Sequence, residues 1–271
     1  MSDNVIDIQF RNKIAIVTIN RPERRNAFNS KVLDGLNLAA ERLKKEPSRA
    51  VILTGAGDAA FSAGFDVNPD NPMTSEMFDA IMQKNRGLAQ GLVDRLRDAM
   101  DAFISIPVPL IAAVNGNAYG AGAEIAARCD LRVMGRSSVF CFSEVTLGLM
   151  PDCGGGAALS KLIGFSRAAD LILTARRVGA DEALSLGLVN RVCDDGKALE
   201  VALQLADQIA RNGPRAVQSA LSVVRQSLNH SLEESLAYEK KSAVSLILSG
   251  ECVHGVAAFF EKRPPLFPDP D

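Results

Sequence analysis

Three short apolar segments constrain the fold of this chain most strongly. Residues 50–54, 110–114 and 131–134 consist mostly of Val, Ile, Leu and Ala, as expected for strands buried on both faces. Each is followed by a polar or glycine-containing stretch, and segments with helical periodicity lie between them. This recurrence of strand, loop and helix predicts an α/β fold with a repeating ββα layout, in which the loops converge at the carboxyl ends of the strands.

The two ends of the chain differ in character. The first 20 residues predict a hairpin, because two largely apolar runs flank a polar turn at 11–13. From about residue 151 onward the chain is mostly helical. We therefore divide it into a β-containing core over residues 1–205 and a helical C-terminal segment over residues 206–271.

Two long helices are expected inside the core. Ser30 is suited to cap a helix that runs to about Lys45. Helical periodicity then extends from Ser75 to about Ile104, before two prolines end it.

The composition is that of an ordinary soluble protein. Of the 271 residues, 47% are hydrophobic and 23% are charged, and the net charge of −2 offers no basic stripe for a nucleic acid. The five cysteines include no CxxC pair, which favours reduced thiols over a disulfide framework. Because the N-terminus lacks a signal-peptide pattern and no run reaches ~20 apolar residues, we expect a cytoplasmic protein without a membrane partner.

Several familiar chemistries find little support. Residues 55–60 match a dinucleotide-binding fingerprint, but they run into a second small-residue loop instead of a helix. An NAD-linked reductase is therefore only an outside alternative. His230 and His254 lack metal-ligand spacing, and no zinc-protease, serine-hydrolase or P-loop motif is present, so we expect no metal.

Two small-residue loops can bring a ligand close to the backbone. Residues 61–66 contain Gly64, which can adopt a positive φ and aim the next amide outward, although a tight turn without a ligand explains this segment alone better. Residues 115–124 lead into a helix whose first turn has almost no side-chain bulk, so its free N–H groups suit an oxygen that becomes negative during a reaction. Glu124 is then either a favourable first-turn acid or a catalytic group, and spacing does not decide between them.

Residues 140–156 hold two carboxylates, Glu144 and Asp152, in an otherwise uncharged stretch. Buried acids are costly unless they are paired or used, and burial raises their pKa towards a working range. The apolar residues on both sides argue against solvent-exposed loop acids. Cys153 has no histidine near it in sequence to activate it, which favours an inert thiol over a nucleophile.

These segments, in this order, resemble the enoyl-CoA hydratase/isomerase (crotonase) superfamily over nearly the whole chain. The matching motifs are residues 19–28, 61–66, 111–116, 144–156 and 260–263. Together they are highly specific for the superfamily and less specific for the reaction. The resemblance implies a crotonase-like spiral of ββα units, an acyl-CoA thioester substrate, no additional cofactor, and C-terminal helices that assemble homotrimers or homohexamers.

The resemblance also implies roles for particular residues. The backbone N–H groups of Phe65 and Ala121 would form an oxyanion hole, with Ala121 standing where the family usually has glycine. Glu124 and Glu144 occupy the places of the two glutamates of hydratases, which implies addition of water to a trans-2-enoyl-CoA. The expected coenzyme A contacts are Arg24, Arg25, Ala27, Ala63, Gly64, Asp66 and, from a neighbouring subunit, Lys262.

Asp152 departs from the hydratase pattern, in which glycine is typical. Several isomerases of the superfamily carry a catalytic acid there, so an enoyl-CoA or dienoyl-CoA isomerase that uses Asp152 is the alternative reaction. Residues 67–109 are longer than usual for the family, and analogy does not predict this lid over the acyl pocket. A non-catalytic acyl-CoA-binding or RNA-binding member of the fold is the alternative from another class; the acidic pI argues against RNA, and the three intact acids argue against a dead enzyme.

Overall fold

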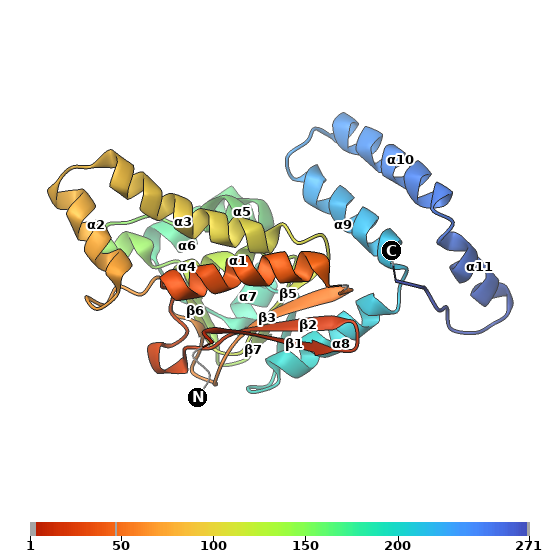
Figure 1. Cartoon of the computed structure of the whole chain (residues 1–271), viewed down its shortest axis with the longest axis horizontal. Helices are drawn as coiled ribbons and strands as arrows, with labels where there is room; N and C mark the ends of the chain where they lie inside the picture. The colour runs from red at the N-terminus through yellow and green to blue at the C-terminus, as the bar shows by residue number, and fades with distance from the viewer. Residues whose placement is uncertain (1–3, 47, 270–271) are drawn as a thin grey trace.

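The computed structural model describes residues 4–46 and 48–269, and a six-stranded sheet forms its centre (Figure 1). The strands of this sheet are β1 (Ile6–Arg11), β2 (Ile14–Ile19), β3 (Ala50–Gly55), β5 (Leu110–Val114), β7 (Leu131–Gly135) and β10 (Arg191–Cys193), in the order β1-β2-β3-β5-β7-β10. β1 and β2 form the predicted antiparallel hairpin, and every other neighbouring pair is parallel.

Both faces of this sheet are covered, which explains why its strands are apolar throughout. On β3, Val51 and Leu53 join the main core beneath α1 (Ser30–Lys45), α3 (Arg86–Ile104) and α4 (Ala121–Arg128). Ala50 and Ile52 point to the opposite face, where they meet α8 (Ala198–Ala210). The alternation follows from the two-residue period of a strand.

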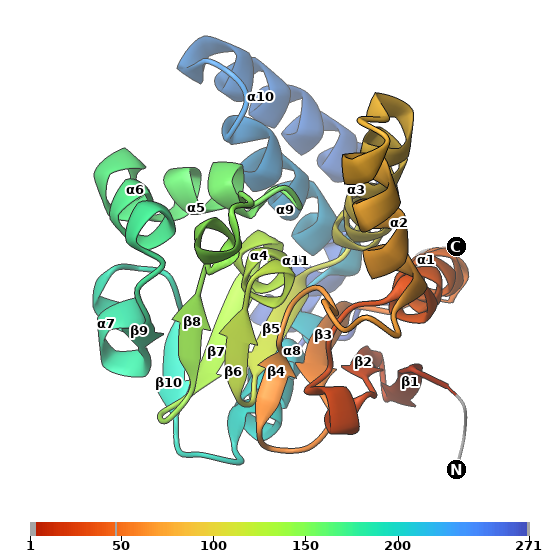
Figure 2. The same ribbon diagram turned by 90° about the vertical axis from the view of Figure 1, so that its left-hand side faces the viewer.

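A second sheet, which the sequence did not predict, holds the loops of the site in place (Figure 2). Its strands are β4 (Ala60–Ser62), β6 (Asn117–Tyr119), β8 (Val139–Cys141) and β9 (Val178–Gly179), in the order β4-β6-β8-β9. β4, β6 and β8 are parallel and follow β3, β5 and β7 along the chain. Each unit therefore sends a long strand to the first sheet and a short strand to the second, which is the predicted repeating ββα spiral.

The prediction of one continuous helical stretch from Ser75 to Ile104 is wrong, because two separate helices occupy this part of the chain. α2 (Pro72–Met82) and α3 form a hairpin, and Lys84 between them adopts a left-handed φ of 47°. The Asn85 side chain accepts a hydrogen bond from the Leu88 N–H at 3.2 Å and so begins a new helix.

The predicted cap of α1 is also wrong by one residue. Ser30 is the first residue of the helix, and the side chain of Asn29 accepts the hydrogen bond from the Val32 N–H at 3.1 Å. Asn and Ser both favour the N-cap position. Asn29 occupies it because its backbone is extended, as an N-cap requires, whereas Ser30 is already helical.

The chain is mostly helical beyond residue 151, as predicted, and its helices there include α5 (Gly155–Ile163), α6 (Phe165–Thr174), α7 (Ala180–Ser185), α9 (Pro214–Ser227), α10 (Leu232–Leu248) and α11 (Cys252–Phe260). Two short 3₁₀ helices, η1 (Pro22–Arg24) and η2 (Glu144–Leu147), were not predicted. α8 packs on the central sheet, whereas α9, α10 and α11 extend away from it (Figure 1). The division at residue 205 stays a prediction.

Polar contacts tie the C-terminal helices to the core. Arg225 of α9 forms a two-pronged ion pair with Asp130 at 2.6 and 2.8 Å. Arg49 of the core donates to the carbonyl oxygens of Ala210 and Phe267 at 2.7 and 2.6 Å. Among the described residues, no single helix is long and apolar enough to span a membrane; α10 and α11 satisfy that criterion only jointly, and they meet at a bend of 68°.

Candidate active site

A cavity of about 500 Å³ lies between the α2–α3 hairpin and the start of α4. The 67–109 segment, whose structure analogy did not predict, supplies one apolar wall, and the stretch from η2 to α5 supplies the other. The apolar lining residues include Met73, Met77, Ile81, Leu92, Leu96, Leu147, Leu149 and Met150. Such a wall suits an apolar acyl chain.

The residues predicted for the reaction meet at one cavity, although they come from three separate segments. The cavity is lined by Ala63, a predicted coenzyme A contact, and by the predicted reaction residues Phe65, Ala121, Glu124, Glu144 and Asp152. The first two follow β4, the next two begin α4, and the last two follow β8. Parallel pairing of β4, β6 and β8 places the ends of these strands side by side.

The N–H group of Phe65 points away from its neighbouring strand. The carbonyl oxygen of Gly64 accepts a hydrogen bond from Phe28 at 2.7 Å, and the N–H of Asp66 donates to the Phe28 carbonyl at 2.9 Å. Because successive amides of an extended strand point in opposite directions, the N–H between them faces the other side. It has no hydrogen-bond partner among the described residues.

The N–H group of Ala121 is free for a different reason, since Ala121 is the first residue of α4. Gly64 lies close to it with a φ of 86°: a β-carbon built on Gly64 would come 3.1 Å from the Ala121 nitrogen and 2.7 Å from the Tyr119 carbonyl oxygen. Only glycine permits this approach of the two loops. The two predicted oxyanion-hole amides thus come from adjacent loops.

Glu124 is almost completely buried, and its two oxygens differ. Oε2 accepts a hydrogen bond from the Gly155 N–H at 2.7 Å, at the start of α5. Oε1 is buried without a partner among the described residues. Burial above all raises the pKa of Glu124 to about 8; the charges of Glu144 and Asp152 add to the rise, and the Gly155 N–H opposes it. A first-turn acid that only favoured its helix would be solvated, so this environment supports the catalytic interpretation.

Glu144 faces the same space from the opposite side. Both of its carboxylate oxygens are buried and have no partner within the described ranges. Burial raises its pKa, and Asp152 contributes to the rise. Gly120 lies beside this group: a β-carbon built there would be in ordinary contact with Glu144 Oε1 at 3.5 Å, and the positive φ of 50° is what favours glycine at this position. Two buried carboxyl groups with raised pKa values favour a state in which the pair holds a proton at neutral pH.

Asp152 and Cys153 complete the acidic end. The Cys153 thiol donates to Asp152 Oδ1 at 3.4 Å. The Cys153 sulfur and one carboxylate oxygen each from Asp152 and Glu124 lie within 4.8 Å of one another. Burial, and then the charges of Glu124 and Asp152, strongly raise the pKa of the Cys153 thiol. A thiol held in its protonated form is a poor nucleophile, in accord with the inert role inferred from the sequence.

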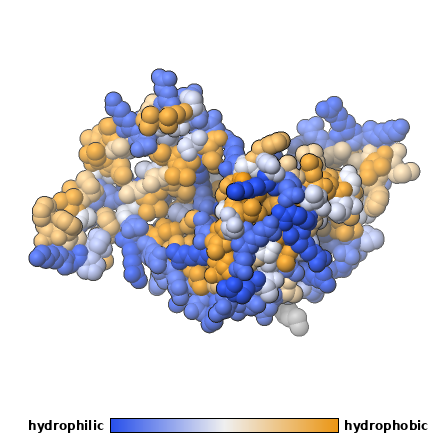
Figure 3. All heavy atoms as spheres, turned by 180° about the vertical axis from the view of Figure 1, so that it is seen from behind, coloured by the Kyte–Doolittle hydropathy of each residue, from blue (hydrophilic) through white to orange (hydrophobic). Residues whose placement is uncertain are grey.

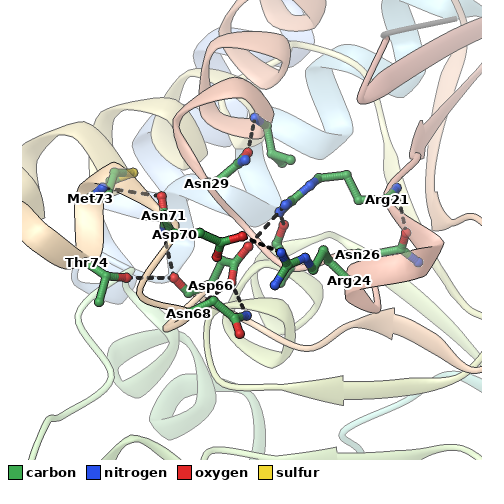
Figure 4. A network of polar contacts seen from close by, with 12 residues as sticks. Arg21, Arg24, Asn26, Asn29, Asp66, Asn68, Asp70, Asn71, Met73 and Thr74 are labelled. Carbon is green, nitrogen blue, oxygen red and sulfur yellow. Dashed lines mark hydrogen bonds and ion pairs between the residues drawn. The ribbon is translucent and has the colours of Figure 1, made fainter.

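The residues predicted to contact coenzyme A flank the loop after β4 (Figure 4). Asp66 is buried and pairs with Arg21 at 3.1 Å; burial alone would raise the pKa of Asp66, but hydrogen bonds from Asn68 and Arg21 hold it below its ordinary value. Arg24 reaches Asp70 at 2.5 Å. The sequence did not single out Arg21, although its contact with Asp66 orders this loop.

The other predicted coenzyme A contacts divide into two groups. Near the cavity, the carbonyl oxygen of Arg25 accepts a hydrogen bond from the Ala63 N–H at 2.9 Å, and that of Ala27 accepts one from Arg21 at 2.6 Å. Lys262 follows α11 in the segment that extends from the core, and it does not line the cavity of its own chain.

Comparison with known proteins identifies the class to which this fold and site belong. The profile of the family described as "Enoyl-CoA hydratase/isomerase" matches residues 9–270. A solved enoyl-CoA hydratase from Bacillus anthracis superimposes with a TM-score of 0.88 and 32% identity, covering 97% of this chain and 98% of that one. The α/β fold is therefore the crotonase fold, as the sequence predicted.

Named relatives agree with this assignment. The chain is 34% identical over 264 residues to a protein named short-chain-enoyl-CoA hydratase from Clostridium acetobutylicum, covering 97% of each. It is 35% identical over 267 residues to a protein named 2,3-dehydroadipyl-CoA hydratase from Escherichia coli, covering 98% of this chain and 99% of the relative. The chain belongs to the enoyl-CoA hydratase/isomerase family.

Proposed function

We propose that this chain is an enoyl-CoA hydratase, which adds water to the double bond of a trans-2-enoyl-CoA. The observation that carries the proposal is the facing pair of Glu124 and Glu144: Oε1 of Glu124 and both oxygens of Glu144 are buried without a partner among the described residues, next to two free N–H groups. Buried polar atoms without partners are rare, and a water molecule held between the two carboxyl groups would satisfy them. The hydratase names of the two relatives support the same reaction.

In this mechanism the thioester oxygen would accept hydrogen bonds from the N–H groups of Phe65 and Ala121. As the water oxygen bonds to Cβ, the electrons of the double bond move towards the thioester and an enolate oxygen develops. Each N–H would accelerate the reaction by about 10²–10³-fold, because it is fixed in place before the charge appears.

The two glutamates would handle the protons. One carboxylate takes a proton from the attacking water, and a carboxylic acid of the pair delivers a proton to Cα, so the enolate collapses to the 3-hydroxyacyl product. A pair that holds one proton at neutral pH can do both, and the raised pKa values of Glu124 and Glu144 favour that state. The reaction as written uses no cofactor beyond the coenzyme A of the substrate.

The rest of the substrate would follow the cavity and its rim. The acyl chain would lie between the α2–α3 hairpin and the stretch from η2 to α5, and coenzyme A would lie along residues 21–28 and 61–66. Lys262 would reach the nucleotide from a neighbouring subunit of a homotrimer or homohexamer. We place the reaction in cytoplasmic fatty acid metabolism.

A second candidate reaction rests on Asp152. Its carboxylate lies within 4.8 Å of the Glu124 carboxylate and lines the same cavity. A third acid at this distance could carry a proton between Cα and a more distant carbon, which would move a double bond without adding water. This is the enoyl-CoA or dienoyl-CoA isomerase alternative.

Mass spectrometry separates the two reactions. We expect the purified chain to convert crotonyl-CoA into a product heavier by one water, and Glu144→Gln to abolish most of that conversion. Glu200→Gln, an exposed acid of α8 that pairs with Lys197, is the control and should behave like the wild type. If 3-enoyl-CoA is isomerised, crotonyl-CoA is untouched and Asp152→Asn stops the isomerisation, the isomerase assignment replaces the hydratase.

A further inference from the structure

The loop that carries Asp152 has little support of its own. Residues 148–154 connect η2 to α5 without regular structure. The Leu149 N–H still donates to the Glu144 carbonyl at 3.1 Å, and the Gly154 carbonyl accepts from Ala158 in α5. Between these two points, one side chain from outside the loop hydrogen-bonds to its backbone among the described residues, and that side chain is Arg128.

Arg128 reaches the loop from the last turn of α4. Its Nη1 donates to the Cys153 carbonyl oxygen at 2.8 Å, and its Nη2 binds Asp101 near the end of α3. Only 14% of the side chain is exposed. Gly154 packs directly on it, since a β-carbon built there would lie 3.3 Å from the guanidinium carbon, and the φ of Gly154 is 89°.

This contact sits next to the catalytic acids in two ways. Glu124 and Arg128 are four residues apart on one helix, so they lie on the same face. Gly155, whose N–H donates to Glu124 Oε2, is two residues beyond the carbonyl that Arg128 holds. The carbonyl that the guanidinium binds is therefore two residues along the chain from the N–H that lowers the pKa of Glu124.

We infer that Arg128 is a positioning residue for the hydration reaction, an inference that rests on the proposed function. It fixes the 152–155 stretch against α4, so that the Gly155 N–H meets Glu124 and Asp152 stays beside it. It also joins this stretch to α3, whose Leu92 and Leu96 line the acyl pocket. One guanidinium group therefore fixes the position of the apolar wall of the acyl pocket relative to the acids.

Four variants test this inference by crotonyl-CoA hydration across a pH series. Arg128→Met removes the donors but keeps an unbranched side chain, and it should lower kcat by about 10²-fold with little change in KM. Without the Gly155 hydrogen bond the acid pair holds its proton more tightly, so both limbs of the pH profile should move to higher pH. Arg128→Lys should restore part of kcat, and Asp101→Asn should have a smaller effect.

Arg97→Met is the matched control, because Arg97 also bonds to Asp101 at 3.2 Å but does not touch the loop. It should leave both kcat and the pH profile unchanged. Arg128→Met with a lower melting temperature but an unchanged kcat and pH profile would assign Arg128 a merely structural role and overturn the inference. If Arg128→Met does not fold, Arg128→Lys and Asp101→Asn give the same comparison of pH profiles.

Hydrogen exchange keeps this test separate from the proposed function. The Gly155 amide should be protected in the wild type and in Arg97→Met, and it should exchange faster in Arg128→Met, whether or not crotonyl-CoA is hydrated. Inactive wild type with this exchange pattern would refute the hydratase assignment alone. Unchanged exchange in Arg128→Met would refute the positioning role.

Discussion

At the inner end of the cavity, Glu124 and Glu144 bury carboxylate oxygens that have no partner among the described residues, whereas α10 and α11 leave large apolar side chains in solvent. Leu248 is 81% exposed and Phe259 is 78% exposed. Within α9, α10 and α11, all inside the described ranges, the structure buries only Pro214 and Ala258. Figure 3 shows the resulting apolar side chains on the lobe that these helices form.

The buried acids of the cavity and the exposed apolar side chains of α10 and α11 require different kinds of partner. A buried carboxylate without a partner costs free energy, which water, substrate or a shared proton can offset at the cavity. Exposed apolar side chains gain free energy from burial, and clusters of them mark protein–protein contacts. We therefore propose that the cavity is completed by a small substrate and the C-terminal helices by other copies of the chain.

The largest effect should come from neutralising an acid of the pair. Glu144→Gln and Glu124→Gln each remove a proton donor or acceptor while keeping the side-chain shape, so each should lower kcat for crotonyl-CoA by about 10²–10⁴-fold. Steady-state absorbance assays check this prediction, with Glu200→Gln as the control. Retention of wild-type kcat in both variants would break the link between the buried oxygens and the chemistry.

Deleting one of the free N–H groups should cost somewhat less. Ala121→Pro removes the N–H at the first position of α4, where proline is tolerated in a helix, and should lower kcat by about 10²–10³-fold. Ala180→Pro is the matched control, because it makes the same change at the first residue of α7 after an extended Gly179. Equal activities of the two proline variants would rule out a role for the Ala121 amide.

Substitutions on the exposed apolar surface of the C-terminal helices should change the association of subunits. A charge at an exposed apolar position, as in Phe259→Asp, should weaken subunit association by about 30-fold, the equivalent of about 2 kcal/mol. Sedimentation velocity over a range of protein concentrations measures the shift. Lys241→Asp, an exposed change on α10, should leave the assembly intact. A wild-type chain that stays monomeric at all concentrations would contradict the proposed use of this surface.

The smallest effect concerns stability and pH. Because the pKa of Glu124 rises from 4.5 to about 8 on folding, the folded chain binds this proton more tightly than the unfolded chain. The stability from this group is present below its unfolded pKa and is lost as pH rises through its folded pKa. Glu124→Gln removes that loss, so at alkaline pH it should be more stable than the wild type. Urea unfolding at several pH values checks this, and parallel pH curves for the two proteins would contradict it.

The parts of the fold that could be predicted are those with strong local patterns. The hairpin and β3, β5 and β7 are apolar enough to be identified directly. The short strands β4, β6 and β8 have only three residues each, too few to show the two-residue period of a strand, although they include strand-favouring residues such as Val139 and Phe140. The break near Lys84 was missed because helical periodicity continues on both sides of it.

The site shows the same limit. The two loops and three acids could be found because each belongs to a motif that is continuous in sequence. Arg128 and the Gly155 amide act through contacts made 25 and 31 residues away along the chain, so no local pattern marks them. The apolar wall from α2 and α3 depends on how that hairpin packs, which residue types alone do not determine.

Incubation of the purified wild type with crotonyl-CoA in water labelled with heavy oxygen tests the hydratase assignment most directly. We predict a 3-hydroxyacyl-CoA product that carries one labelled oxygen at Cβ, and a loss of that product in Glu144→Gln. An unlabelled isomer of unchanged mass, or no reaction with trans-2-enoyl-CoA of any chain length, would contradict the assignment.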